Sequence, residues 1–329
     1  ASAGDGGGSI RIPASACGLF GLKPSRGLIP LAPEGDPWLG LVVRHVVSRS
    51  VRDSAALLDA TSGPFSGSLY AQPNRPRSYQ ARLDRPPRRL KVGVSRRSFL
   101  DEAQHPDCVA AIEDAAALLE SLGHTVIDLE LPIPHEEVAR AYLTIVAAGV
   151  AADVAATEQK TGRSPNPTMF ERPTWFLKQV GDAISARELY EAHAVAARVT
   201  QDLGALFDAE IDVHLSSTMA APPVEVGELA VDLPKKVALS VLQRVPTPTV
   251  VLRQALAQLA HDSLEKTPNT QVFNLTGQPA MSVPLFWNRQ NLPIGVQIAG
   301  RFGSEELLLR LAQQLHDARP WFAKMPAIR

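Results

Sequence analysis

The segment that decides the fold reads Gly4-Asp5-Gly6-Gly7-Gly8-Ser9-Ile10-Arg11-Ile12-Pro13-Ala14-Ser15. Glycine has no Cβ, so the backbone N–H groups of such a run can approach a ligand closely and form an anion-binding concavity. The run ends in a serine, whose hydroxyl is a nucleophile once a base takes its proton. The segment therefore predicts a nucleophile, Ser9, beside backbone donors that can stabilise a negative charge.

A glycine-rich segment that ends in serine has other possible roles. Taken alone, a glycine-rich turn followed by serine is more often a flexible linker or a phosphate-binding nest than a catalytic site. Ile10 and Arg11 follow the serine, so the segment is not the Gly-x-Ser-x-Gly elbow of an α/β-hydrolase.

The wider pattern favours catalysis. The segment and its continuation to Pro24 resemble the amidase signature family of serine hydrolases, whose hallmark reads Asp-x-Gly-Gly-Ser-Ile-Arg-x-Pro-Ala. This resemblance implies that Ser9 attacks an amide carbonyl while the N–H groups of Gly6, Gly7, Gly8 and Ser9 surround the developing oxyanion. Each such donor lowers the barrier by roughly 3 kcal/mol. Gly6 stands where the family usually has Thr, Ile or Ala.

Asp5 and Arg11 flank the glycine run with opposite charges. We expect them to hold the loop in its oxyanion-binding shape, by pairing with each other or with backbone groups. The alternative is a pair of solvent-exposed charges worth under about 1 kcal/mol.

The resemblance also implies how the serine is activated. In the family a neutral buried lysine draws the proton through a second serine held by a cis peptide bond, and both residues precede the glycine loop. Lys23 belongs to a Gly-Leu-Lys-Pro segment that does not supply this base. We therefore expect residues 1–329 to be the carboxy-terminal portion of an amidase that is inactive alone. It needs a missing amino-terminal segment or a companion fragment.

The middle of the chain alternates between strand and helix patterns. A strand is predicted at 90–95, a helix at 107–121 and a second strand at 124–129, which together form a βαβ unit with parallel strands. Long helices are predicted at 136–160 and 185–209, and the second opens with a capping box, Ser185 to Glu188. A further strand is expected at 212–217.

The last third predicts a β-hairpin, with strands in 273–284 and 292–300 and Asn291 at the turn. With the earlier elements, the resemblance implies an α/β fold, an α/β/α sandwich around a central mixed β-sheet, as a single domain over 1–329. The segment 231–266 matches the family least, and two helical patterns in it are split by Pro246 and Pro248. We expect substrate choice to lie there, in a variable acyl pocket.

Composition excludes several classes of function. The 329 residues are 45% hydrophobic and carry a net charge of −1, which gives no electrostatic basis for a nucleic-acid partner. We expect no membrane partner, because no apolar stretch reads as long enough to span one. The eight histidines are scattered and the two cysteines form no Cys-x-x-Cys pair, so no metal site and a cytoplasmic setting are expected.

The leading hypothesis is a cofactor-free amidase acting on a small-molecule amide. Gln278 and Ile12 make the chain more similar to bacterial amidases and cyclic-amide (nylon-oligomer) hydrolases than to amidotransferase subunits. Two alternatives stay open: an amidotransferase subunit that releases ammonia from glutamine, and a non-catalytic protein that keeps the fold. Homodimer formation is also left open.

Overall fold

The computed structural model describes residues 1–99, 103–228, 264 and 266–324, and it is built on an eight-stranded sheet. In sequence order the strands are β1 (Ser2–Asp5), β2 (Phe20–Lys23), β3 (Val43–Ser48), β4 (Lys91–Val94), β5 (Thr125–Asp128), β6 (Val213–Ser217), β7 (Ala280–Trp287) and β8 (Pro293–Gly300). Their order across the sheet is β1-β3-β2-β7-β8-β6-β4-β5. Segments far apart in the chain therefore lie side by side.

The sheet is mixed, as predicted. The strands from β1 to β6 in the spatial order pair antiparallel, whereas β6, β4 and β5 pair parallel. The parallel pair β4–β5 is joined by helix α3 (Pro106–Ser121), which confirms the predicted βαβ unit. The predicted closing hairpin is also confirmed, because β7 pairs with β8 and Asn291 at the turn has a left-handed φ of 59°.

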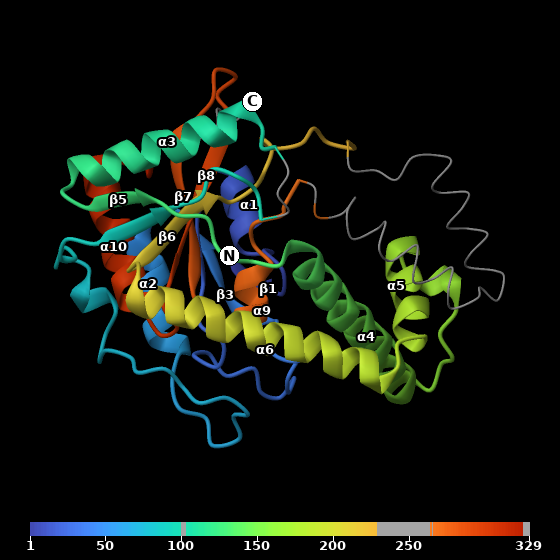
Figure 1. Cartoon of the computed structure of the whole chain (residues 1–329). Coiled ribbons are helices and arrows are strands. Elements are labelled where there is room, and N and C mark those ends of the chain that lie inside the picture. Colours follow the sequence, from blue (N-terminus) through green and yellow to red (C-terminus); the bar gives the residue numbers. More distant parts are fainter. Residues whose placement is uncertain (100–102, 229–263, 265, 325–329) are drawn as a thin grey trace.

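Helices cover both faces of this sheet (Figure 1). On one face lie α2 (Val51–Thr61), α3 and α10 (Glu305–Ala318). On the other lie α1 (Arg11–Ala16), α6 (Ala186–Ala209) and α9 (Val272–Thr276), and α4 (His135–Thr161) and α5 (Arg172–Asp182) extend away from it. Short 3-10 turns occupy Gln80–Arg82 and Pro167–Met169. The α/β class and the α/β/α layering agree with the sequence.

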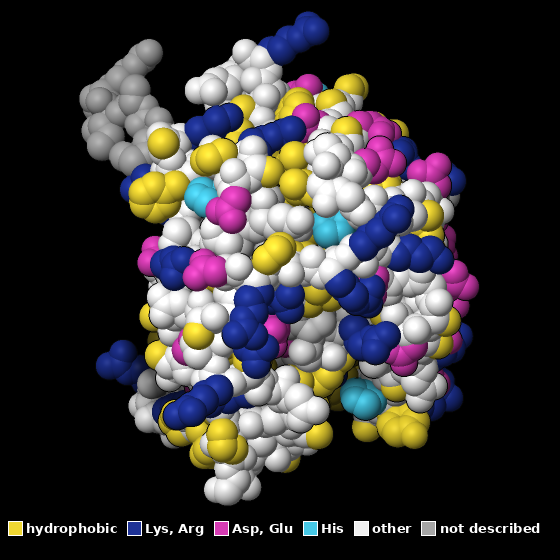
Figure 2. Space-filling view, turned by 90° about the vertical axis from the view of Figure 1, so that its left-hand side faces the viewer, with side chains coloured by type: hydrophobic (Ala, Val, Ile, Leu, Met, Phe, Trp, Pro, Cys, Tyr) yellow, Lys and Arg dark blue, Asp and Glu magenta, His cyan; other side chains and the backbone are white. Residues whose placement is uncertain are grey.

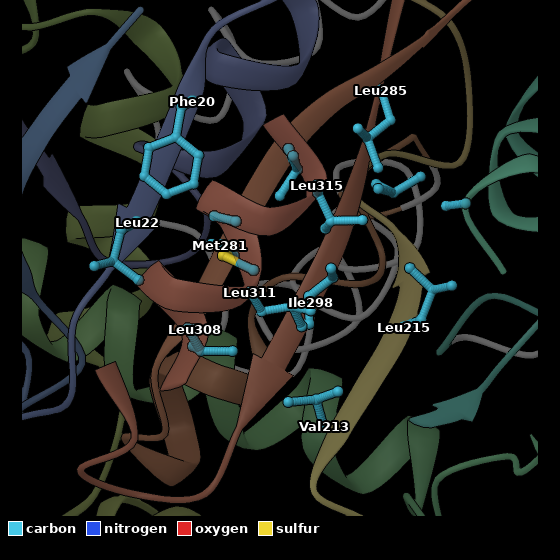
Figure 3. Close-up of a cluster of buried hydrophobic side chains, with 14 of the residues drawn as sticks. Phe20, Leu22, Val213, Leu215, Met281, Leu285, Ile298, Leu308, Leu311 and Leu315 are labelled. Atoms are coloured by element: carbon cyan, nitrogen blue, oxygen red, sulfur yellow. The ribbon is translucent and has the colours of Figure 1, made fainter. Parts of the chain in front are cut away.

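The larger core fills the layer beneath α2, α3 and α10. Alternate residues of each strand point into it, because successive side chains in a strand face opposite sides of a sheet. Phe20, Leu22 and Met281 meet Leu308 and Leu311 of α10 there, all with no exposed surface (Figure 3). Burying a side chain of this size contributes roughly 1.5–3 kcal/mol, so this layer fixes the sheet on which the site is built.

Local signals placed the long helices well. The capping box at the start of α6 is present, with the Ser185 hydroxyl accepting from the Glu188 amide and the Glu188 carboxylate accepting from the Ser185 amide. One boundary was wrong: residues 273–276, expected in a strand, belong to α9. Gly277 ends this helix with a left-handed φ of 80°, a conformation that glycine adopts without a Cβ penalty.

The expectation that no apolar stretch is long enough to span a membrane was also wrong. Helix α4 is long and apolar enough, by length and composition, to cross a membrane. In the structure 44% of that apolar stretch is buried, and α4 packs against α5 and α6. A core helix that is covered on several sides has the same composition.

Charges of both signs mix on the surface. Figure 2 shows Lys and Arg side chains lying among Asp and Glu side chains on one face, with hydrophobic side chains scattered between them. Exposed ion pairs such as Arg52–Asp84 and Arg44–Glu34 occur among the described residues. The lack of a nucleic-acid partner stays a prediction.

Candidate active site

The glycine run forms a loop that connects the edge strand β1 to the short helix α1. Asp5 ends the strand, Gly6 to Gly8 bend the chain, and Ser9 and Ile10 form the turn before Arg11 begins α1. Ile10 is fully buried, whereas Ser9 is exposed. The apolar neighbour anchors the turn, and the serine is left accessible at its tip.

Glycine is required at two positions of the loop for different reasons. Gly8 has a φ of +127°, a backbone conformation that residues with a side chain rarely adopt, and a Cβ there would lie 2.6 Å from Ile12 Cδ1. Gly7 has no such φ, but a Cβ would overlap the Tyr142 side chain, 2.8 Å from its Cζ. The loop backbone is therefore held against its surroundings at a distance that only glycine permits.

A buried ion pair holds the loop from inside. Asp5 and Arg11 have no exposed side-chain surface, and Arg11 Nη2 lies 2.9 Å from Asp5 Oδ1. The same carboxylate accepts from the Gly8 amide at 2.7 Å and from the Ile10 amide at 3.2 Å. Asp5 thus binds both the backbone of the loop and the guanidinium, which is the arrangement expected from the sequence.

Arg11 uses all its donors. Nε donates to Asp5 Oδ2 at 3.1 Å, Nη1 to the Thr270 carbonyl and Gln297 Oε1, and Nη2 to Asp5 Oδ1 and Asn274 Oδ1. A guanidinium carries five N–H groups in a rigid fork, so none is left unpaired here. The side chain therefore joins the loop to α9 and to the centre of the sheet.

The pKa of Asp5 reflects these contacts. Burial alone raises the pKa of a carboxyl group, but the Arg11 charge and hydrogen bonds outweigh it and lower the pKa of Asp5 to about 2. Asp5 is therefore ionised at neutral pH. Its charge is matched inside the protein, so the loop geometry needs no solvent ion.

The loop leaves some amide groups free for a ligand. Among the described residues no hydrogen bond engages the N–H groups of Gly6, Gly7 or Ser9. Gly8 differs from the expectation, because its N–H donates to Asp5. The N–H groups of Gly6, Gly7 and Ser9 are therefore unpaired among the described residues, whereas that of Gly8 supports the loop, and their role as oxyanion donors stays a prediction.

Residues from far along the chain complete the loop's support. The Thr270 hydroxyl donates to the Gly7 carbonyl at 2.6 Å. Asn274 donates through Nδ2 to the Asp5 carbonyl at 2.9 Å and to the Leu41 carbonyl at 3.0 Å. These roles were not predicted, and Asn274 stands in the segment 273–284 that was expected to form the first strand of the closing hairpin. In Figure 1, α9, which carries Asn274, lies next to β1.

Two aromatic side chains line the loop from other elements. Trp38 packs against Gly6, where a Cβ would lie 2.9 Å from its ring, and its Nε1 donates to Asp153 of α4 at 3.3 Å. Trp38 has a left-handed φ of 54°, a conformation that costs about 1 kcal/mol or more for a bulky residue. Tyr142, from α4, contacts Gly7. Neither was predicted from the sequence.

Lys23 lies in the interior and takes no part in Ser9 contacts. Its side chain is fully buried, and Nζ donates to the Pro24 carbonyl at 2.8 Å. Burial, followed by the nearby Arg11 charge, lowers the pKa of Lys23 to about 7. No described side chain forms a hydrogen bond with the Ser9 hydroxyl, and the described residues hold no cluster of three metal-ligating side chains.

Comparison with known proteins identifies the family. The Amidase family model matches residues 1–309. This chain belongs to the amidase family. The chain is 34% identical over 333 residues to the 6-aminohexanoate-cyclic-dimer hydrolase of Pseudomonas sp. (strain NK87), covering 98% of this chain and 64% of that protein. It is 33% identical over 333 residues to the enzyme of the same name from Paenarthrobacter ureafaciens, with the same coverage.

Solved structures agree in fold. A structure of 6-aminohexanoate cyclic dimer hydrolase matches with a TM-score of 0.82 and 32% identity, over 99% of this chain and 65% of that one. A bacterial aryl acylamidase of the amidase signature family has the same fold, with a TM-score of 0.75 and 21% identity over 99% of this chain and 64% of that one. The chain thus spans about 64% of the length of the curated relatives it matches.

Proposed function

We propose that the intact protein is an amidase that hydrolyses a carboxylic amide through an acyl-enzyme on Ser9. Membership of the amidase family supports the class of reaction. We base the assignment of the nucleophile on one observation: the exposed Ser9 directly follows a loop whose free Gly6 and Gly7 amides can bind an oxyanion.

The proposed reaction has two steps. The Ser9 oxygen attacks the carbonyl carbon, the carbonyl oxygen becomes an oxyanion held by the N–H groups of Gly6, Gly7 and Ser9, and the C–N bond breaks as the amine leaves with a proton. Water then attacks the Ser9 ester and releases the carboxylic acid and the free hydroxyl. Fixed donors aimed at charge that appears only in the transition state lower the barrier of both steps.

The base is the second part of the proposal. A serine hydroxyl needs a proton acceptor within hydrogen-bond reach. The described residues provide none at Ser9, and Lys23 is bonded to the Pro24 carbonyl. We assign proton transfer to the lysine and second serine of the family pattern, which in the family precede the glycine loop.

Covalent labelling tests the nucleophile. A fluorophosphonate probe should label the intact protein at Ser9, as mapped by mass spectrometry, and Ser9→Ala should lower amide turnover by several orders of magnitude. Ser2→Ala is the matched control, because Ser2 is an exposed serine in the strand that leads to the loop. An active protein that is labelled elsewhere, or that keeps its turnover without the Ser9 hydroxyl, contradicts the proposal.

A further inference from the structure

A narrow pocket lies beside the loop. Its walls are mainly apolar and come from three parts of the chain, including Phe99, Ile133, Val138 and Val272. Tyr142 also lines it, and the same side chain contacts Gly7. The pocket therefore begins one tyrosine ring away from the proposed oxyanion donors.

One polar atom in this pocket has no partner. Gln271 lines the pocket and is only 5% exposed. Its Nε2 donates to the Thr267 carbonyl at 2.7 Å, which fixes the orientation of the amide, and its Oε1 has no hydrogen-bond partner among the described residues. Buried acceptors are nearly always paired in folded proteins, so this oxygen is a site for a donor that the protein itself does not supply.

The surroundings define the chemistry of that donor. The lining holds two other polar side chains, Tyr142 and His135, and the His135 ring is bonded through Nδ1 to the Phe99 carbonyl. No Asp or Glu lines the pocket among the described residues. An ammonium group would lose its hydration here without gaining a counter-charge, which is costly. The free space accommodates about one water-sized group. The space beside Gln271 therefore fits only a small neutral donor group of a ligand, such as an N–H or O–H.

We propose that Gln271 is a specificity-determining residue, whose Oε1 accepts a hydrogen bond from a neutral N–H or O–H group carried by the amide substrate away from its scissile bond. This inference rests on the proposed function and names its substrate class: amides with a second, uncharged donor. Tyr142 forms the wall between that donor and the loop.

Matched substrates test this assignment. Two series of amide substrates are compared: one carries a second amide N–H in the acyl part, and the other carries it in the amine part. Each substrate is compared with an ester isostere, in which oxygen replaces the N–H of that second amide while the scissile amide is kept. In one series the N–H compound should have a kcat/KM about 10- to 100-fold higher. Gln271→Leu should bring this ratio close to 1.

Controls separate specificity from folding. Gln290→Leu, at an exposed turn, should keep the wild-type ratio. If Gln271→Leu lowers the melting temperature, Gln271→Met provides a second variant that lacks the amide oxygen and has only a weak acceptor in its thioether sulfur. A wild-type ratio below about 2 in both series overturns the inference and indicates that water alone satisfies Gln271. A preference for an ammonium group over N–H overturns it as well.

Direct binding keeps the two proposals distinguishable. The Ser9→Ala protein is titrated by calorimetry with N-acetyl-6-aminohexanoate, with its ester isostere 6-acetoxyhexanoate, and with the ammonium compound 6-aminohexanoate. Tighter binding of the N–H compound than of the other two, lost in the Ser9→Ala/Gln271→Leu protein, supports the role of Gln271 even if Ser9 proves not to be the nucleophile. Turnover and Ser9 labelling without any N–H preference leave the proposed function intact and reject the inference.

Discussion

Arg11→Met should be the most destabilising single change in the loop. It removes five hydrogen bonds and leaves the Asp5 carboxylate buried without its counter-charge. Breaking one side of a buried pair costs about 3–5 kcal/mol, because the remaining charge stays desolvated. Total stabilities are about 5–15 kcal/mol, so this one substitution removes a large share.

Urea unfolding followed by circular dichroism measures the loss. The control is Arg44→Met, which breaks the exposed ion pair with Glu34, a 2.6 Å contact between side chains that are 48% and 49% exposed. That change should cost under about 1 kcal/mol. Adding Asp5→Asn to Arg11→Met should cost less than the sum of the two single changes, by about 1–3 kcal/mol, since the two residues share one network.

The pH dependence gives a second signature. In the wild type the pKa of Asp5 is lowered to about 2 from 3.8, so its contribution is complete above pH 3.8 and is lost as the pH falls toward 2. Without Arg11, burial moves the pKa of Asp5 upward. Protonation of Asp5 then removes the buried charge, so the loss in free energy of unfolding caused by Arg11→Met should be larger at pH 7 than at pH 3. A loss no greater than the one caused by Arg44→Met would refute the reasoning.

Two further predictions concern Gly7 and the buried histidines. Gly7→Ala should cost about 1–3 kcal/mol through overlap with Tyr142, and less in a Tyr142→Phe background; an equal cost in both backgrounds contradicts this contact. Burial lowers the pKa of His45 to about 4 and of His214 to about 3, so both stay neutral in the fold while the unfolded chain takes up protons below pH 6.5. Proton uptake by each of these two histidines in the unfolded chain should therefore lower the free energy of unfolding by about 2 kcal/mol between pH 7 and pH 5. Measured by urea unfolding, this fall should be smaller in His214→Gln and unchanged in the control His193→Gln, which replaces an exposed histidine.

Sequence patterns carried much of the fold because they are local. The capping box at Ser185 and the periodicity of α3 and α6 depend on neighbouring residues alone, and the structure has these elements where they were predicted. The short α9 was missed, since a helix of five residues is not stable by itself and forms only where tertiary contacts hold it. The segment 231–266 lies outside the described residues except for 264 and 266, so its role as a variable pocket stays a prediction.

The same division applies to the site. Asp5, the glycines, Ser9 and Arg11 are neighbours in sequence, and their residue types alone indicated an anion-binding loop braced by opposite charges. No sequence pattern predicts which backbone N–H groups of the loop remain unpaired, because that depends on the position of the Asp5 carboxylate. In the structure this carboxylate accepts a hydrogen bond from the Gly8 N–H.

Contacts across the sheet were decided only by tertiary structure. The order β1-β3-β2-β7-β8 brings the loop at the start of the chain next to Asn274 and Gln297 near its end. Tyr142 and Gln271 likewise meet at one pocket from segments that are distant in sequence. Local residue types determine what a loop can do chemically, whereas packing over long sequence separations determines which side chains surround it, because burial of apolar surface is non-directional and acts on the whole fold at once.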